Sequence, residues 1–364
     1  MLFHPFEIAF CGYSGSGKTT LIASIVRHLS ARLSIGYYKH GCHRFEIDRE
    51  GKDSWIIKQA GAVSIMISDP EKKALIFPQT SQNSRHEQYA FSELDMLLVE
   101  GLKEIPLPKL ILVDRERKIL DLVKNASITN VAALVVPDDP TSYTGLCLPV
   151  LHRNHIGDIA TFIESFLLEY SSNSRAMNGL VLAGGRSLRM GSDKALLIYH
   201  PENQLLHTTA LLRQQCHAVF VSCREEQAAT YCPFGIPLIT DSYIGIGPLG
   251  GVLSAQRTNP SAAWVVVACD LPYLDKNILH QLIKERDPMR FATAFRNPDS
   301  GMLEPFLACY EPKSRHPLIE RHLEDKNSLS LFLKESRIKV LIPKNSDALQ
   351  NINDPVAQKG VRHP

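Results

Sequence analysis

The chain has 364 residues, too many for one typical hydrophobic core and suited to two domains of average size. Its 44% hydrophobic and 21% charged residues are ordinary for a globular protein, and no apolar run approaches the roughly 20 residues that would span a bilayer. A formal net charge of +2 argues against a strongly basic surface, so neither nucleic acid nor a membrane is expected as a partner.

The cysteines and the N-terminus predict a cytoplasmic location. Eight cysteines are scattered without a C-x-x-C pair, a pattern typical of reduced thiols rather than of a disulfide framework or a zinc knuckle. The first residues, Met1 to Glu7, have neither a basic region nor a small-residue cleavage site, so we expect no secretory signal.

The first half alternates apolar runs with helical patterns, which predicts an α/β domain. A strand over Ile8–Phe10 leads into a Gly-rich turn, and a helix with apolar positions from Leu21 to Leu29 follows. Apolar residues at helical spacing from Ile159 to Tyr170 predict a closing helix. Four other runs are short and β-branched enough to be buried parallel strands: Val63–Ile67, Met96–Val99, Leu110–Val113 and Val131–Val136.

A polar stretch then separates the two predicted domains. Residues 171–175 have nothing to bury, so we place a linker at about residues 171–177, between domains of residues 1–172 and 177–364. The second domain begins with a strand over Leu180–Leu182 and has further apolar runs at Val219–Val221, Trp264–Ala268 and Phe306–Ala308. Both halves are predicted as α/β folds that bind ligands at the carboxyl ends of their strands.

Residues 12–19 fit the P-loop pattern G-x-x-x-x-G-K-S/T at each fixed position. Small residues allow successive backbone N–H groups to converge on phosphate oxygens, and Lys18 adds a positive charge. A chance Gly-rich turn is the alternative, but the strand before and the helix after disfavour it. We therefore expect a nucleoside triphosphate to bind through Gly12, Gly15, Ser16, Gly17, Lys18, Thr19 and Thr20.

A phosphate-bound Mg²⁺ usually also needs a carboxylate from a neighbouring strand. Glu100 ends the apolar run that begins at Met96, so we predict Thr19 and Glu100 as metal ligands; a solvated strand-end acid is the alternative. Asp48 and Asp53 lie in a polar stretch that can either reach this site or remain on the surface.

Residues 40–43 offer three further metal-ligand types, in His40, Cys42 and His43. Three candidates in one loop make a poor tetrahedral chelate without a fourth ligand, so a loop packed near the nucleotide is the better interpretation. The base is left open at this point, because no N-K-x-D sequence occurs and a P-loop alone does not distinguish GTP from ATP.

Several segments together make the first half, over about residues 5–170, resemble the molybdopterin-guanine dinucleotide biosynthesis adapter of the MobB type. They are the P-loop, Lys39-His40, residues 48–54, residues 60–62 and residues 99–103. The resemblance implies GTP binding in preference to ATP, weak hydrolysis, and an accessory role beside a guanylyltransferase.

The second half has its own candidate phosphate loop. The glycines of Leu182-Ala183-Gly184-Gly185 allow the backbone to wrap a triphosphate, and Arg186, Arg189 and Lys194 can neutralise it; a solvated basic loop is the alternative. Asp270 follows the apolar run Trp264–Ala268, at the strand end where a Mg²⁺ ligand is expected. Asp241 precedes a glycine-dense segment at 245–251.

With Glu304-Pro305-Phe306 and residues 351–355, these pieces resemble molybdenum cofactor guanylyltransferase of the MobA type over about residues 177–360. The resemblance implies a Rossmann-like nucleotidyltransferase fold of the nucleotide-diphospho-sugar transferase kind. It also implies transfer of GMP from GTP to Mo-molybdopterin, which gives molybdopterin guanine dinucleotide and pyrophosphate. By its motif, Arg189, Lys194 and Asp270 would be catalytic, Asp270 would hold Mg²⁺, and GTP would be contacted by Leu182, Ala183, Gly184, Gly185, Lys194, Asp241 and Asp270.

Two positions depart from that family's pattern. Cys223-Arg224 stand where an Asn that helps to read the nucleotide is usual, and Asp354 stands where Thr is usual. Two alternatives stay open: a nucleotidyltransferase of the cytidylyltransferase or sugar-phosphate type, and a regulatory P-loop adapter without transfer activity. As partners the resemblance implies GTP and molybdopterin, together with molybdenum-insertion proteins and apo-molybdoenzymes.

Overall fold

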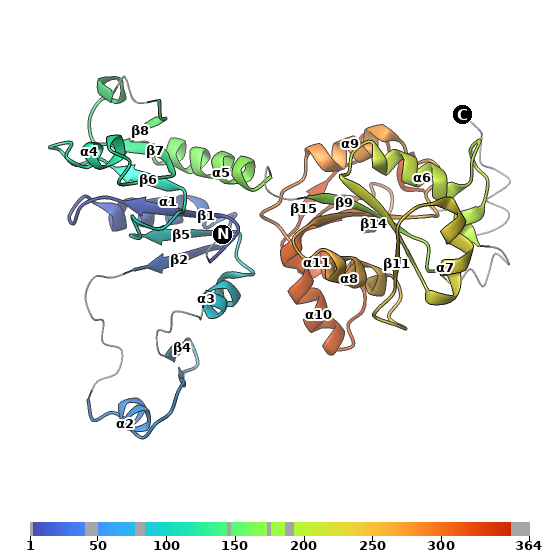
Figure 1. Cartoon of the computed structure of the whole chain (residues 1–364), viewed down its shortest axis with the longest axis horizontal. Coiled ribbons are helices and arrows are strands. Elements are labelled where there is room, and N and C mark those ends of the chain that lie inside the picture. The colour runs from blue at the N-terminus through green and yellow to red at the C-terminus, as the bar shows by residue number, and fades with distance from the viewer. Residues whose placement is uncertain are drawn as a thin grey trace. The chain divides into compact units, whose positions relative to one another are not determined.

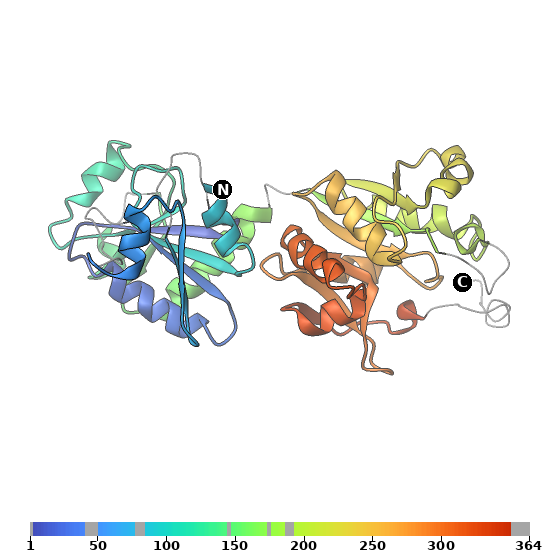
Figure 2. The same ribbon diagram turned by 90° about the horizontal axis from the view of Figure 1, so that it is seen from below.

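The computed structural model describes residues 3–40, 50–76, 84–143, 147–172, 176–185 and 193–350. The chain divides into two compact units, Met1–Ser171 and Ser172–Pro364. Each unit has a β-sheet flanked by helices (Figures 1 and 2), which confirms the predicted two-domain α/β fold. Within the described ranges, no helix combines the length and the apolar character needed to cross a membrane.

The first unit contains a six-stranded sheet in the order β2-β5-β1-β6-β7-β8, with every neighbouring pair parallel. Strands β1, β5 and β6 are buried at every position, which explains why they are continuous apolar runs rather than alternating ones. The strands are β1 (Glu7–Cys11), β2 (Ile35–Lys39), β5 (Met96–Glu100), β6 (Lys109–Leu112), β7 (Val131–Val136) and β8 (Val150–His152).

The helices of this unit are α1 (Lys18–Leu29), α2 (Asp53–Gln59), α3 (Ser84–Phe91), α4 (Ile119–Lys124) and α5 (Ile156–Ser172). As predicted, α1 buries its apolar face, from Leu21 to Leu29, and α5 closes the unit. Because α5 continues through Ser172, the first two residues of the predicted linker are helical. Residues 173–175 of that linker lie outside the described residues.

The predicted buried parallel strand at Val63–Ile67 is wrong. Strand β3 (Ile65–Ser68) instead pairs antiparallel with β4 (Lys73–Ile76) in a separate two-stranded sheet, and Val63 is 75% exposed. The turn explains the difference: Asp69 accepts hydrogen bonds from the backbone N–H groups of Glu71 and Lys72, both at 2.8 Å. This local turn pairs the run with the segment that follows it, so a hairpin forms.

The second unit contains a seven-stranded mixed sheet in the order β11-β10-β9-β12-β14-β13-β15. Strand β14 runs antiparallel to both of its neighbours, and all other pairs are parallel. The start of β14 therefore lies at the same edge as the carboxyl ends of β9 and β12. The strands are β9 (Met177–Leu182), β10 (Ala218–Cys223), β11 (Leu238–Thr240), β12 (Ala263–Ala268), β13 (Ala292–Arg296), β14 (Leu303–Tyr310) and β15 (Lys339–Leu341).

Alternate residues of β12 serve two hydrophobic clusters: Trp264 and Val266 belong to one, Val265 and Val267 to the other. Since successive strand residues point to opposite faces, this sheet is covered on both sides (Figure 2). The helices of the second unit are α6 (Gln204–Arg213), α7 (Glu225–Tyr231), α8 (Pro248–Thr258), α9 (Lys276–Lys284), α10 (Arg315–Leu323) and α11 (Leu329–Glu335).

A buried ion pair joins the segment after α9 to the end of β14. Arg286 donates from Nε to Glu311 Oε1 at 2.5 Å and from Nη2 to Oε2 at 2.8 Å, and the Glu311 side chain is fully buried. Burial opposes the charge on Arg286, but Glu311 outweighs it and raises the pKa of the guanidinium. The two-pronged geometry therefore keeps both groups charged inside the unit.

Candidate functional sites

The P-loop connects β1 to α1 at the carboxyl edge of the first sheet, and its glycines are required by the backbone. Gly15 and Gly17 have φ angles of 75° and 83°, in the left-handed region that glycine adopts without steric cost. A Cβ atom on Gly12 would lie 2.6 Å from Ser16 Oγ and 3.1 Å from the Leu112 carbonyl oxygen. The three predicted glycines thus have distinct conformational or packing roles.

Lys18 folds back over this loop. Its ammonium group donates to the carbonyl oxygens of Gly12 at 3.2 Å and Tyr13 at 2.9 Å. Burial lowers the pKa of Lys18, although Glu100 acts in the opposite direction. Ser16 Oγ is buried and has no hydrogen-bond partner in the structure. An orphaned hydroxyl beside a partly desolvated ammonium group suits an anionic ligand such as a phosphate.

Thr19 and Glu100, the predicted metal ligands, are in direct contact. The Thr19 hydroxyl lies 3.0 and 2.9 Å from the two carboxylate oxygens, and Tyr37 donates to the same carboxylate at 2.7 Å. Lys39 Nζ lies 3.3 Å away. Burial alone would raise the pKa of Glu100, but the bonds from Tyr37, Thr19 and Lys39 outweigh it and lower that pKa. An ionised carboxylate beside a hydroxyl is the hard oxygen set that Mg²⁺ prefers.

The other residues predicted for the first site are either exposed, in backbone contacts only, or outside the described residues. Thr20 is exposed on the first turn of α1, where its carbonyl accepts from the Ser24 hydroxyl at 3.1 Å. Asp53 is exposed at the start of α2. His40 donates its backbone N–H to the Glu100 carbonyl at 3.1 Å and so extends the pairing of β2 with β5. Asp48, Cys42 and His43 lie outside the described residues.

Sequence reasoning missed Arg153, which follows β8. Its Nη2 donates to the carbonyl of Ser16 at 3.0 Å, across 137 positions of the chain. It also missed Tyr37, on β2. Neither residue belongs to a local motif, so only the sheet order brings it to the phosphate loop and its carboxylate.

The second candidate site is a pocket of about 200 Å³, partly open to solvent, at the carboxyl edge of the second sheet. It brings together predicted residues from three segments, and it is also lined by Asp193, by Pro248 of the glycine-dense segment and by Phe306 of the Glu304-Pro305-Phe306 piece. The predicted residues that line it are Leu182, Ala183, Gly185, Lys194 and Asp270.

Lys194 and Asp270 form the charged centre of this pocket, with Nζ 3.5 Å from Oδ2. Asp270 Oδ1 is buried without a hydrogen-bond partner. Burial raises the pKa of Asp270, whereas Lys194 lowers it. A half-satisfied carboxylate in a pocket suits a divalent cation, because a cation would satisfy the orphaned oxygen and favour the charged form.

Glu304 approaches Asp270 from the neighbouring strand. The antiparallel pairing of Val267 with Leu307 sets the start of β14, which carries Glu304, beside the end of β12, which leads to Asp270. Burial is the main cause that raises the pKa of Glu304, and the charge of Asp270 raises it further. The sequence pattern Glu304-Pro305-Phe306 did not reveal this proximity, because it depends on β14 being antiparallel to β12.

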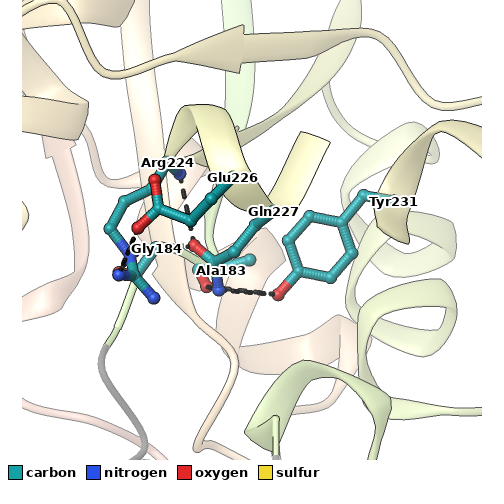
Figure 3. Close-up of polar contacts among 6 residues, drawn as sticks. All are labelled: Ala183, Gly184, Arg224, Glu226, Gln227 and Tyr231. Carbon is teal, nitrogen blue, oxygen red and sulfur yellow. Dashed lines mark hydrogen bonds and ion pairs between the residues drawn. The ribbon is translucent and has the colours of Figure 1, made fainter. Parts of the chain in front are cut away.

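Helix α7 holds the Gly-Gly loop by its carbonyl groups (Figure 3). Arg224 Nε donates to the Gly184 carbonyl at 3.0 Å and Gln227 donates to the Ala183 carbonyl at 3.3 Å. The Tyr231 hydroxyl lies 3.3 Å from the same Ala183 oxygen and donates to Asp193 at 2.5 Å. In a trans peptide the next N–H points opposite to the carbonyl, so the N–H groups of Gly184 and Gly185 point away from α7. They are therefore available to a phosphate.

This arrangement accounts for one departure from the family pattern. Cys223 is buried, and Arg224 caps α7 while supporting the loop; its Nη1 also lies 2.6 Å from Glu226 (Figure 3). Asp241 accepts from Ser222 at 2.9 Å, and a Cβ on Gly184 would lie 3.4 Å from its other oxygen.

Gly184 and Asp241 are thus neighbours beside the pocket. Burial raises the pKa of Asp241, and the bond from Ser222 opposes this. Arg186, Arg189 and residues 351–355, including Asp354, lie outside the described residues.

The two halves match two sequence families. Residues 7–136 match the family of molybdopterin guanine dinucleotide synthesis protein B, and residues 179–339 match the MobA-like NTP transferase domain. An adapter protein of molybdopterin-guanine dinucleotide biosynthesis from Haemophilus influenzae is 34% identical over 44% of this chain and 88% of its own length. A molybdenum cofactor guanylyltransferase from Pseudomonas putida is 31% identical over 48% of this chain and 92% of its own length.

A molybdenum cofactor biosynthesis bifunctional protein from Synechocystis sp. is 30% identical over 49% of this chain, an alignment that spans 51% of that relative. The matches fall on the halves that carry the two phosphate loops and their carboxylates. The chain therefore belongs to the molybdopterin guanine dinucleotide synthesis protein B family through its first half and to the MobA-like NTP transferases through its second.

Proposed function

We propose that the second half transfers GMP from GTP to Mo-molybdopterin, forming molybdopterin guanine dinucleotide and releasing pyrophosphate. The observation that carries this proposal is the Lys194–Asp270 pair, with its orphaned carboxylate oxygen, in a pocket lined by the Gly-Gly loop. The name of the guanylyltransferase relative from Pseudomonas putida supports the choice of reaction.

In this reaction the terminal phosphate of the pterin attacks the α-phosphate of GTP in line. The N–H groups of Gly184 and Gly185, together with Lys194 and Arg189, bind and neutralise the triphosphate, while Asp241 contacts the nucleotide. Asp270 would hold Mg²⁺, which when bound neutralises charge on the transferred and departing phosphates. Catalysis then rests on positioning and charge stabilisation without a covalent enzyme intermediate.

We further propose that the first half is a GTP-binding adapter with weak hydrolytic activity. Its P-loop and Lys18 would bind the phosphates, and Thr19 and Glu100 would hold Mg²⁺. The name of the adapter relative supports this role. We propose molybdenum-insertion proteins and apo-molybdoenzymes as the partners of this half. We also propose a cytoplasmic location, because scattered cysteines without a C-x-x-C pair are typical of reduced thiols.

A transfer assay with the purified chain, Mo-molybdopterin and each nucleoside triphosphate in turn tests the main proposal. We expect that, among the nucleoside triphosphates, only GTP gives pyrophosphate and a dinucleotide product with Mo-molybdopterin. Product with CTP instead would identify a cytidylyltransferase. Pyrophosphate from none of the nucleotides would favour a regulatory adapter without transfer activity.

A further inference from the structure

A polar cluster at the carboxyl edge of the first sheet has no role in the functions proposed above. Arg117 Nη2 donates to Asp138 Oδ2 at 2.9 Å, and the Tyr143 hydroxyl donates to Asp138 Oδ1 at 2.6 Å. The Arg117 guanidinium also lies over the Tyr143 ring, 4.3 Å from its centroid. We call these three residues the Asp138 cluster.

The Asp138 cluster is held in place before any ligand arrives. Asp114, just beyond β6, accepts from the backbone N–H groups of Lys118 at 3.1 Å and Ile119 at 3.0 Å, which fixes the loop between them. Within this loop Arg117 has a φ of 58°, a left-handed conformation that costs a side-chain-bearing residue free energy. Tyr143 is only 5% exposed and belongs to the hydrophobic core. Strained backbone and a buried ring thus together orient Asp138.

The Asp138 cluster lies where the base of a nucleotide bound in the P-loop is expected. The Thr19–Glu100 pair lies on the β5 side of β1, so metal-bound terminal phosphates belong on that side. The nucleoside then extends the other way, over β6 and β7. Asp138 lies just after β7, which is two strands from β1, or about 10 Å at the usual interstrand spacing. Phosphates and base of one nucleoside triphosphate can span this separation.

We propose that the Asp138 carboxylate reads the guanine base of the nucleotide bound in the P-loop. The proposal rests on GTP binding in the first half. A carboxylate has about four acceptor positions, and Arg117 and Tyr143 occupy one on each oxygen. The remaining pair can accept from the N1–H and 2-amino groups of guanine.

The same chemistry discriminates against adenine. Adenine has an acceptor at N1 and no 2-amino group, so it would face an ionised carboxylate without a donor in either position. The side chain of Asp138 is 48% exposed, and a base can therefore reach it. The cluster thus supplies a physical basis for preferring guanine although the N-K-x-D sequence is absent.

The test is a change of base preference in the full chain, with Lys194→Ala added to weaken nucleotide binding in the second half. GTP, ATP, inosine triphosphate and xanthosine triphosphate would compete with a fluorescent GTP analogue. We expect Asp138→Asn to weaken GTP binding about ten- to a hundredfold. We also expect it to strengthen xanthosine triphosphate binding, because an amide can donate to the 2-carbonyl of xanthine while accepting from N1–H. Tyr143 can retain its contact, because its hydroxyl accepts as well as donates.

Asp139→Asn is the matched control. Asp139 is adjacent and exposed and accepts from the backbone N–H of Thr141 at 2.9 Å, a role that asparagine can also fill. This control should keep the original preference for GTP. If Asp138→Asn leaves the binding of all four nucleotides unchanged, or weakens the binding of all four equally, the cluster only stabilises the fold. The base-reading proposal is then wrong.

A Lys18→Ala chain, in the same Lys194→Ala background, separates this outcome from failure of the proposed function. If its binding equals that of the parent, no nucleotide occupies the P-loop, and GTP binding in the first half is itself wrong. Lys18-dependent binding with an unchanged base preference overturns only the role of Asp138.

Discussion

At the residue scale, each candidate site combines a partly buried lysine with a carboxylate. Lys18 and Glu100 serve the first site, and Lys194 and Asp270 serve the second. The electrostatic balance differs between them. Three donors keep the pKa of Glu100 low, whereas burial keeps that of Asp270 raised. Asp270 therefore depends more strongly on a cation to stay ionised.

Lys18→Ala should abolish nucleotide binding in the P-loop, because it removes the ammonium group that the loop carbonyls orient toward the phosphates. Equilibrium binding of a fluorescent GTP analogue measures this loss. GMP transfer should largely persist, since the second pocket has its own lysine. A complete loss of transfer would contradict independent sites.

Asp270→Asn should lower the rate of pyrophosphate release about a hundredfold or more, as expected for loss of a group that stabilises transition-state charge. Binding of Mn²⁺ to the second half, followed by electron paramagnetic resonance, should weaken in parallel. Asp299→Asn, in an exposed turn, is the control and should change neither quantity. Normal pyrophosphate release by Asp270→Asn would exclude its catalytic role.

The sequence predicted the residues of both loops because each loop is a local motif. It did not predict Arg153, Tyr37 or Glu304, which reach their partners through strand order or antiparallel register. Arg224 shows the same limit: its sequence position indicated a missing nucleotide contact, whereas the fold shows a support for the Gly184 carbonyl.

At the element scale, α7 should control how well the Gly-Gly loop binds phosphate. Arg224→Leu removes the donor to the Gly184 carbonyl and should raise the KM for GTP about two- to tenfold, the usual worth of one hydrogen bond. kcat should change less, because Lys194 and Asp270 remain. Arg224→Lys should recover part of the loss, and Glu226→Gln should leave KM nearly unchanged. An unaltered KM in Arg224→Leu would contradict this supporting role.

The buried Arg286–Glu311 pair should anchor β14 to the segment after α9. Glu311→Gln leaves Arg286 charged and without its ionic partner, so the free energy of unfolding should fall by about 3–5 kcal/mol. Urea denaturation followed by tryptophan fluorescence of Trp264 reports on this unit. The double variant Arg286→Met with Glu311→Leu should lose less stability than Glu311→Gln. A larger loss in the double variant would contradict this explanation.

The wrong prediction of a buried parallel strand at Val63–Ile67 also has its explanation in a single element, the turn that follows β3. A short apolar run has no property that distinguishes a buried parallel strand from one arm of a hairpin. The decision comes from Asp69, whose side chain organises the following turn. Longer or flanked runs, such as Val131–Val136, were predicted correctly because strand and helix signals alternate around them.

At the scale of the whole molecule, the two α/β units and the two family memberships could be predicted, because each motif lies within one half of the chain. The mixed character of the second sheet could not be predicted in the same way. Phe306–Ala308 is an apolar run like the others, and its antiparallel direction depends on a chain path that no local pattern specifies.

Magnesium removal should affect both halves. We expect GTP with Mg²⁺ to slow amide hydrogen exchange in residues 12–19 and 182–185, and we expect chelation by EDTA to remove most of that protection at both loops. Asp270→Asn should remove the metal-dependent protection only at residues 182–185. Equal protection at either loop with and without the chelator would contradict a metal-dependent site there.

The contact between Arg153 and the Ser16 carbonyl has a bearing on where the first half can be cut. The family match ends at residue 136, before β8 begins at Val150. A fragment that ends at residue 136 would retain every residue of the P-loop. It would lose Arg153, whose guanidinium donates to the Ser16 carbonyl within that loop. The segment that matches the family is therefore shorter than the segment needed to keep all the contacts of the P-loop.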